Sequence, residues 1–280
     1  MIIRTISTSD FNFIIELAAS ENVRYTKADL TSIMEYEPDG CFIALDGERR
    51  LGIVSTVVLG KIGWIGNVFV ERSARRRGAG SKLVREALRY IQDKGGESPK
   101  LYCFPHRIAF YKRLGFSTET NIQVFGEIGR KTSFSNVKEL NQDSLDELIT
   151  LDESFFGANR SKILCRLLQE FEEYCFGTYI DGKLVGYIMA SGSGDEYELG
   201  PWVCEPKYQD RLAEDLLRVA INKLDGKNFE LSSPMHNTVC EAILQKFNFK
   251  SKGVAVRMGL GRSSLGRIEG VLGTAGLDKG

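Results

Sequence analysis

The stretch ERSARRRGAGSKL, residues 71–83, joins the apolar run WIGNVFV to a segment with apolar residues at helical spacing. That segment, from Ser81 to Lys94, predicts an amphipathic helix. A strand that turns through glycines into the first turn of a helix presents unpaired backbone N–H groups, and the helix dipole favours negative charge there. Gly78 and Gly80 have no side chain and let an anion approach the backbone closely. The stretch therefore predicts a phosphate-binding loop.

The arginines of the same stretch allow a second interpretation, a basic patch that binds nucleic acid. The chain as a whole has 37 Lys and Arg residues against 37 Asp and Glu residues, so its formal net charge is zero. Proteins that bind nucleic acid usually carry a surplus of positive charge. No aromatic residue lies between Arg72 and Arg77 to stack on bases. We therefore expect a cofactor loop and no nucleic-acid partner.

The six cysteines indicate a reducing compartment. None belongs to a C-x-x-C pair, and most lie in apolar runs. This usage is typical of buried free thiols rather than disulfides or a zinc site, so we expect no metal. The first residues, MIIRTISTSDF, lack the basic and apolar regions of a secretory signal, and no apolar run approaches the ~20 residues that span a bilayer. We expect a cytoplasmic protein without a membrane partner.

The order of predicted elements occurs twice, with a period of about 130 residues. Each half has a strand, a helix, a hairpin with an Asp-Gly turn, a strand, a long helix, a strand, a short helix and a final strand, and the first half has a second short helix at Lys27 to Glu35. Asp10 and Asp143 are expected to cap the first helix of each half. The pattern predicts an α/β (α+β) fold with two tandem copies of one domain, residues 1–128 and 135–280. The boundary is expected near GRKTSFS, residues 129–135, which is polar and aperiodic.

A second motif accompanies the glycine loop. Arg75-x-x-Gly78-x-Gly80 is followed about 30 residues later by FYKRLGF, residues 110–116, on the helix after the next strand. The two motifs together, over residues 1 to 128, resemble those of the GNAT superfamily of acetyl-CoA-dependent N-acetyltransferases. The resemblance implies a mixed, mostly antiparallel sheet in each domain, flanked by helices, in which the fourth and fifth strands splay apart to admit the thioester of acetyl-CoA.

The resemblance also implies roles for particular residues. The backbone from Arg75 to Ser81 would hold the pyrophosphate of coenzyme A, with the arginine side chains at its rim, and the preceding strand would lie beside the pantetheine arm and the acetyl carbonyl. Tyr111 would protonate the leaving thiolate; a phenol with a pKa near 10 can donate to a thiolate with a pKa near 8.5. The expected cofactor-binding residues are Val68, Phe69, Val70, Arg75, Arg76, Arg77, Gly78, Ala79, Gly80 and Ser81. The alternative for Tyr111 is a core aromatic.

The sequence leaves the general base open. The strand before the loop has only Asn67 where many members of the superfamily have a glutamate, and proton removal through water is the default expectation. Other candidates are Glu71, which follows that strand, the residues expected to line the acceptor site, and a histidine before the Tyr111 helix. The residues in these last two groups are Glu35, Tyr36, Glu37 and His106.

The second half keeps the fold signals and loses the chemical ones. Its counterpart of the glycine loop, from Lys207 to Arg211, has no glycine, and Leu244 stands at the tyrosine position. Residues including LGPWV and GLDKG resemble the C-terminal domain of a tandem GNAT group, which is expected to pack on the first domain and shape the acceptor site. Four residues could line a pocket for a polar or anionic ligand, or serve only in capping and packing: Arg160, Trp202, Asn237 and Arg257.

These features favour an N-acetyltransferase that moves an acetyl group from acetyl-CoA to a primary amine by direct attack in a ternary complex. The alternative is a non-catalytic acyl-CoA-binding or scaffold protein with the same fold. A small-molecule amine is preferred to a protein as acceptor, because a second domain could enclose one side of the site. The sequence does not indicate an oligomeric state.

Overall fold

The computed structural model describes residues 1–126, 137–235, 237–261 and 266–280. The first half contains strands β1 (Ile2–Thr5), β2 (Phe42–Asp46), β3 (Arg49–Leu59), β4 (Ile62–Val70), β5 (Ser98–Cys103) and β6 (Ser117–Gly126) and helices α1 (Phe11–Ala19), α2 (Lys27–Tyr36), α3 (Ala79–Asp93) and α4 (Ile108–Lys112). The second half contains strands β7 (Val137–Glu139), β8 (Cys175–Ile180), β9 (Lys183–Ser193), β10 (Glu196–Cys204), β11 (Asn228–Pro234), β12 (Lys250–Gly259) and β13 (Val271–Gly273) and helices α5 (Leu145–Phe156), α6 (Ser161–Glu170), α7 (Glu214–Lys223) and α8 (Thr238–Lys246). This order confirms the predicted α/β repeat, with β13 added at the end.

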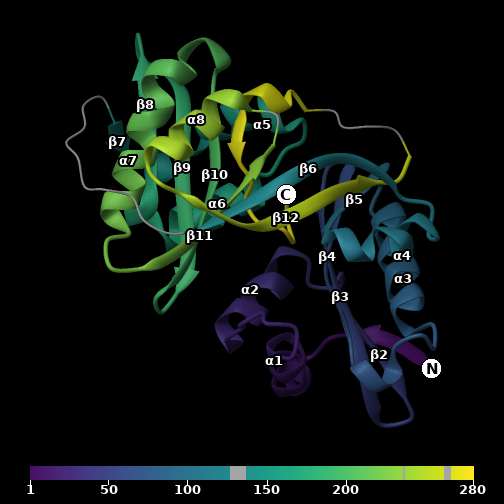
Figure 1. Ribbon diagram of the computed structural model, residues 1–280. Coiled ribbons are helices and arrows are strands. Elements are labelled where there is room, and N and C mark those ends of the chain that lie inside the picture. Colours follow the sequence, from purple (N-terminus) through teal and green to yellow (C-terminus); the bar gives the residue numbers. More distant parts are fainter. Residues whose placement is uncertain (127–136, 236, 262–265) are drawn as a thin grey trace.

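The strands form one continuous mixed sheet that crosses from one half to the other. Its order is β1-β2-β3-β4-β5-β12-β6-β11-β10-β9-β8-β7, and β13 pairs with β10. The sixth strand of each half is therefore exchanged: β12 pairs with β5, and β6 pairs with β11. The two exchanged strands lie side by side in the middle of the molecule (Figure 1). The predicted boundary at 129–135 lies outside the described residues, so the division into 1–128 and 135–280 stays a prediction.

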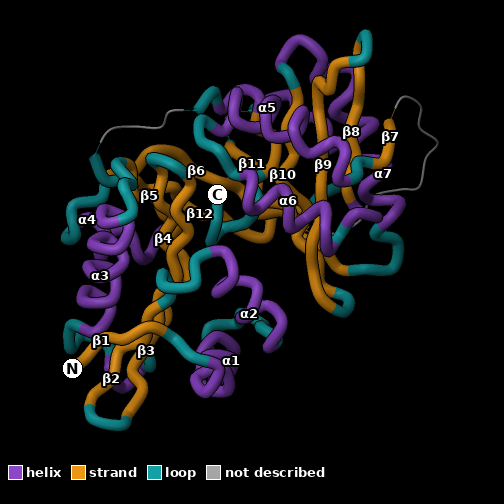
Figure 2. Tube along the Cα trace, turned by 180° about the vertical axis from the view of Figure 1, so that it is seen from behind, coloured by secondary structure: helices purple, strands orange, loops and turns teal. Residues whose placement is uncertain are grey.

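Helices cover both faces of the first half of the sheet (Figure 2). The apolar stripe of α3, including Leu83, Val84 and Ile91, packs with Ile65 and Leu101 on one face, together with α4. Helices α1 and α2 pack on the opposite face, in a separate cluster around Ile43 and Ile53. The strands of this sheet are buried on both faces, so each face has to be covered by a layer of helices.

The two halves share part of their hydrophobic core. Ile62 and Trp64 of β4 belong to the same cluster as Leu148 and Phe155 of α5 and Leu164 of α6. These side chains lie on the face of β4 that is opposite α3. The second half therefore covers a face of the first half that would otherwise be an exposed apolar surface.

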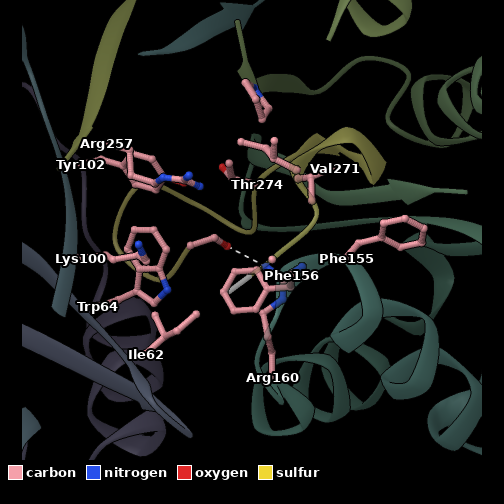
Figure 3. Close-up of a pocket in the computed structure, with 14 residues that line it drawn as sticks. Ile62, Trp64, Lys100, Tyr102, Phe155, Phe156, Arg160, Arg257, Val271 and Thr274 are labelled. Atoms are coloured by element: carbon pink, nitrogen blue, oxygen red, sulfur yellow. Dashed lines mark hydrogen bonds between the residues drawn. The ribbon is translucent and has the colours of Figure 1, made fainter. Parts of the chain in front are cut away.

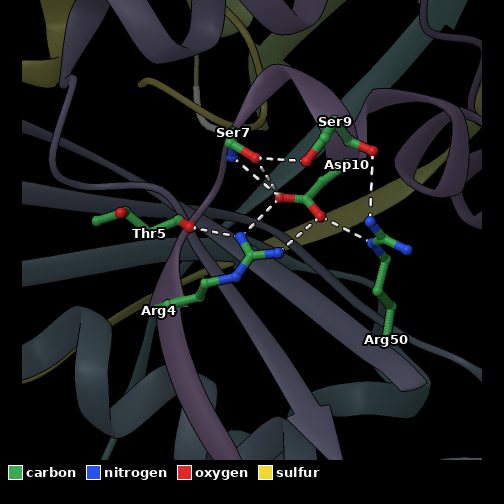
Figure 4. Close-up of polar contacts among 6 residues, drawn as sticks. All are labelled: Arg4, Thr5, Ser7, Ser9, Asp10 and Arg50. Carbon is green, nitrogen blue, oxygen red and sulfur yellow. Dashed lines mark hydrogen bonds and ion pairs between the residues drawn. The ribbon is translucent and has the colours of Figure 1, made fainter. Parts of the chain in front are cut away.

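The expected caps at Asp10 and Asp143 are wrong. Each lies inside a short 3-10 turn before its helix, and a residue before the turn, Ser7 or Asn141, takes the capping position. Asp10 is instead fully buried and accepts hydrogen bonds from Arg4 Nη1 and Nη2 at 2.7 and 2.9 Å and from Arg50 Nε at 2.8 Å (Figure 4). It thus ties β1 to β3 through charge, and it also accepts from Ser7 N at 3.0 Å as the second residue of the capping box of the 3-10 turn.

Two simpler expectations concern the cysteines and membrane spans. All six cysteines are free thiols, and all are buried except the partly exposed Cys165. In the described ranges, no helix has both the length and the apolar character needed to cross a bilayer. The same ranges contain no group of three His, Cys, Asp or Glu side chains that could hold a metal ion.

Candidate functional site

The central opening of the first half lies between β4 and β5. These parallel strands pair only from Ile62 with Ser98 to Ile65 with Leu101, although β4 continues to Val70. Just past the last pair, β4 bulges: its register on β3 shifts after Gly66, and Asn67 takes a positive φ of 54°. The four residues from Asn67 to Val70 are partly exposed, whereas the five before them are buried. This is the splayed arrangement that the sequence predicted.

The loop at the end of this opening presents a row of backbone N–H groups. Arg76 and Gly78 both have positive φ values, 63° and 85°, and α3 begins directly afterwards at Ala79. The first helical hydrogen bond of α3 runs from Lys82 N to Gly78 O at 3.0 Å. Among the described residues, nothing accepts a hydrogen bond from the N–H groups of residues 76–81. These donors and the helix dipole fit an anionic group such as a pyrophosphate.

The three arginines of the loop are not equivalent. The Arg75 side chain donates from Nε to the Val70 carbonyl at 3.0 Å and forms an ion pair with Glu21 of the α1–α2 connection. Arg75 therefore fixes the end of β4 and is not free to bind a ligand. The side chains of Arg76 and Arg77 are exposed and have no ion-pair partner in the described part of the chain. All ten predicted cofactor-binding residues lie around the opening or its loop, and their roles remain predictions.

Tyr111 is buried in α4, where its ring packs against Phe110 and Phe116 at centroid distances of 4.9 and 6.0 Å. It shares this cluster with Cys103, the last residue of β5. Burial, with a smaller contribution from the Cys103 thiol, raises the pKa of the Tyr111 phenol well above its usual value. The phenol therefore carries its proton at neutral pH. Tyr111 is thus a core aromatic, and its role as proton donor stays a prediction.

The carboxylates considered as general base are all engaged elsewhere. Glu37 accepts from Val58 N at 3.0 Å, Tyr90 Oη at 2.9 Å and Lys162 Nζ at 2.6 Å, and these partners outweigh burial to lower its pKa. Glu35 pairs with Arg166 at 2.8 Å. Glu71 pairs with Arg49 at 2.5 Å. The other two candidates are also placed in side-chain contacts: Tyr36 lies under the Arg166 guanidinium, and His106 is exposed and stacks on Phe104.

A polar surface that the sequence did not predict lies on the face of β4 opposite α3. A Cβ atom on Gly66 would come within 2.8–2.9 Å of Asp278, so the chain after β13 passes directly over β4. Lys279 Nζ lies 3.0 Å from Asp278 Oδ1 and 3.7 Å from Glu198 Oε2. Burial raises the pKa of Glu198. In the sequence, the segment GLDKG was noted only because it resembles the C-terminal domain of a tandem GNAT group. That resemblance did not indicate that the segment lies over β4.

The same surface includes the bulge itself. Tyr25, from the connection between α1 and α2, donates its hydroxyl to Asn67 Oδ1 at 2.5 Å. Asn67 Nδ2 in turn donates to Ser55 Oγ at 2.9 Å. Asn67 therefore holds the bulge rather than acting as a free side chain. The surface opposite α3 is thus built by both halves of the chain.

The second half has the same strand geometry, but its opening is filled. β10 and β11 pair in parallel only from Glu196 to Glu198, and β13 then occupies the space beyond, pairing Trp202 with Gly273. Thr274 N continues the contact on the other side by donating to Ser232 O at 2.9 Å. The segment that corresponds to the glycine loop, from Lys207 to Arg211, is held in place as well. Its buried Gln209 side chain donates to the carbonyls of Cys204 and Glu269.

The four residues expected to line a pocket in the second half separate into two pairs. Arg160 and Arg257 do line one cavity, between the two halves. Trp202 is fully buried where β10 pairs with β13. Asn237 caps α8 by accepting from Cys240 N at 3.0 Å. The packing interpretation therefore holds for the second pair.

The fold and the opening define an acyltransferase-type domain that occurs twice. Comparison with protein families agrees: residues 9–116 match the acetyltransferase (GNAT) family, and residues 148–272 match an acetyltransferase (GNAT) domain. The chain belongs to the GNAT acetyltransferase family and carries two GNAT domains. The holothin acyltransferase of Pseudoalteromonas sp. (strain SANK 73390) is 22% identical over 98% of this chain and 92% of its own.

Solved structures share the whole arrangement. A putative acetyltransferase from Pyrococcus horikoshii superposes with a TM-score of 0.85 at 21% identity, covering 100% of this chain and 95% of its own. A tandem GNAT protein from the clavulanic acid biosynthesis pathway superposes with a TM-score of 0.65 at 13% identity, covering 95% and 98%. At these identities the likeness shows the fold, with both domains in one chain.

Proposed function

We propose that this chain is an N-acetyltransferase that moves an acetyl group from acetyl-CoA to a primary amine, with the chemistry in the first half. One observation carries the proposal: beyond Ile65 no strand of the described residues pairs with β4 on its β5 side, whereas β13 pairs with β10 at the equivalent place in the second half. Only the first half also combines the glycine loop with a tyrosine on the following helix. Acetyl-CoA would supply the acetyl group as an activated thioester.

The residues around the opening fit the parts of that cofactor. The unpaired N–H groups of residues 76–81 would hold the pyrophosphate, and Arg76 and Arg77 would line its rim. Residues Val68, Phe69 and Val70, beyond the last β5 pair, would orient the acetyl carbonyl through their backbone. The Tyr111 phenol, kept protonated by burial, would donate its proton to the departing thiolate.

The amine would approach from the opposite face, over Asn67. That face is covered by the second half, which favours a small-molecule acceptor over a folded protein. We propose that the acceptor's proton leaves through water toward Glu198 or Asp278, the carboxylates that the second half places on this surface. Burial raises the pKa of Glu198, which makes its carboxylate a stronger base than an ordinary glutamate.

Two measurements separate this proposal from a non-catalytic acyl-CoA-binding protein. Calorimetry with acetyl-CoA tests the opening, and release of free thiol in the presence of a panel of amines tests the transfer. An N-acetyltransferase binds acetyl-CoA and releases thiol with at least one class of amine. Binding without thiol release over a broad panel would instead support the scaffold alternative.

A further inference from the structure

A cavity of about 30 Å³ lies between the two halves, on the same face of β4 and β5 as the proposed acceptor surface (Figure 3). Trp64, Lys100 and Tyr102 of β4 and β5 line one side, and Arg257 of β12 joins them. The other side is formed by α5, by the α5–α6 connection and by the chain from Gly266 to Gly280. None of the steps proposed above uses this cavity.

The charged side chains of its walls, counted with their ion-pair partners, carry one more positive than negative charge. The Lys100 side chain is 2% exposed, and its ammonium lies 2.6 Å from Glu119 Oε1. Arg257 Nε lies 2.9 Å from Glu119 Oε2, so two cations share one carboxylate, and no second carboxylate pairs with them in the described ranges. The third cation, Arg160, is balanced by Asp152 at 2.6 Å. A buried surplus charge is costly unless an anion compensates it.

Two buried hydrogen-bond donors in the cavity wall are also free. Trp64 is 2% exposed and Thr274 is 4% exposed. Neither Trp64 Nε1 nor Thr274 Oγ1 has a hydrogen-bond partner among the described residues. Buried polar groups in folded proteins nearly always have a partner, so these two point to a ligand or ordered water. Donors beside a surplus cation suit an anionic oxygen.

The cavity lies near the reacting centre proposed above. Trp64 stacks on Tyr102 at a centroid distance of 4.9 Å, at the level where β4 and β5 stop pairing. Gly66, two residues after Trp64 on the same face, contacts Asp278. The intervening segment includes Gly280, whose carbonyl oxygen accepts from Arg160 Nη1 at 2.8 Å, drawn as a dashed line in Figure 3. The cavity and the proposed acceptor surface therefore adjoin on the same face of β4, with the segment from Asp278 to Gly280 packed along that face.

We infer that the cavity is a subsite for a carboxylate, and that the amine acceptor is one that carries such a group. The assignment of the acceptor rests on the proposed function. The carboxylate would lie against Lys100 and Arg257 and accept hydrogen bonds from Trp64 Nε1 and Thr274 Oγ1. A volume of about 30 Å³ accommodates roughly two water-sized atoms, which matches the two oxygens of a carboxylate.

The first experiment tests carboxylate binding without any turnover. The melting temperature of the whole protein is measured against sodium acetate at constant ionic strength, with sodium HEPES, whose anion is too large for the cavity, as the balancing salt. We expect acetate to raise the melting temperature of the wild type and to leave the melting temperature of Lys100→Met unchanged. Lys61→Met is the matched control, because Lys61 is exposed and pairs only with Glu97. Equal acetate responses in wild type and Lys100→Met would overturn the subsite.

Thr274→Val provides a second variant of nearly the same shape in case Lys100→Met does not fold. Its acetate response should be weakened, because it loses a donor but keeps the charge. An unchanged response in Thr274→Val, with Lys100→Met unfolded, would also count against the subsite.

The second experiment tests the acceptor. Linear ω-amino acids of increasing length are compared with their primary amides, using thiol release. In Lys100→Met we expect kcat/KM for the acids to fall about 10-fold or more and kcat/KM for the amides to stay unchanged, since a hydrogen bond to a charged group is lost. Acids and amides that react equally well in the wild type would overturn the acceptor assignment. Acetate binding without acetylation of any amine would overturn that assignment and the proposed function, and would support only the carboxylate site.

Discussion

Tyr111 differs from Tyr90, the other buried tyrosine of its hydrophobic cluster, because no described residue accepts a hydrogen bond from the Tyr111 hydroxyl. Tyr90, on α3, instead donates to Glu37 at 2.9 Å. A buried phenol without a protein partner keeps its proton and remains able to donate it to a ligand. This contrast gives the proposed proton donor a control within the same hydrophobic cluster.

Replacing Tyr111 by Phe should reduce turnover about 100-fold or more at neutral pH, because a positioned general acid contributes on that order. The ring remains, so acetyl-CoA affinity measured by calorimetry should not change. Tyr90→Phe, which also removes one buried hydroxyl, should lower stability and leave turnover intact. Normal turnover in Tyr111→Phe would remove this residue from the proposed mechanism.

Asp10 should make the protein less stable in acid. Burial alone would raise its pKa, but hydrogen bonds from Arg4, Arg50 and Ser7 outweigh burial and lower the pKa well below its usual value. A carboxylate with a lowered folded pKa stabilises the fold above its unfolded pKa of about 4, and this contribution is lost as the pH falls further.

Asp10→Asn should therefore cost about 1–3 kcal/mol of unfolding free energy at pH 7, since it leaves two arginines without their shared partner. The difference from wild type, measured by urea denaturation, should shrink between pH 5 and pH 2. A difference that stays constant over this range would show that the carboxylate acts through shape and not through charge.

At the scale of elements, the loop before α3 depends on the left-handed conformation of Gly78. A Cβ in this conformation costs about 1–2 kcal/mol, and a strained loop would no longer align its N–H groups. Gly78→Val should therefore weaken acetyl-CoA binding about 10-fold or more in calorimetry. Gly60→Val is the matched control: Gly60 has a φ of 57° and open space around it, but lies in a hairpin away from the loop. Equal losses in both variants would point to general destabilisation.

The elements and the glycine loop of the first half could be predicted because their signals are local. Glycines at 78 and 80 between a strand and an amphipathic stripe define a loop whatever surrounds it, and α3 begins within two residues of the predicted start. Asp10 and Asp143 were misjudged because an acidic residue before a helix fits a cap or a turn equally well. The sequence alone could not distinguish between them.

The contacts between distant segments could not be predicted. Nothing in the pattern of residues 271–273 indicates that this short strand fills an opening, because the partners of an edge strand depend on the tertiary fold. For the same reason the acceptor surface was missed. Glu198 and Asp278 are ordinary charged residues in the sequence, and only the passage of the last residues over Gly66 places them beside β4.

At the scale of the whole molecule, the exchanged strands predict that neither half folds by itself. Residues 1–128 alone would lack β12, which separates β5 from β6, and would expose their edges. Expressed separately, each half should be insoluble or partly unfolded by circular dichroism. Expressed together as two chains, 1–128 and 135–280 should copurify and melt in one transition. A soluble, cooperatively melting first half would contradict this prediction.

The exchange of β6 and β12 also bears on the origin of the chain. Two copies of one domain that each complete the other's sheet have the geometry of a domain-swapped homodimer, here joined into a single polypeptide. A dimer of identical subunits must keep both of its sites or neither. A single polypeptide is free of that constraint. One copy can keep the opening between its strands, while the other fills its own with β13 and covers the proposed acceptor surface of the first.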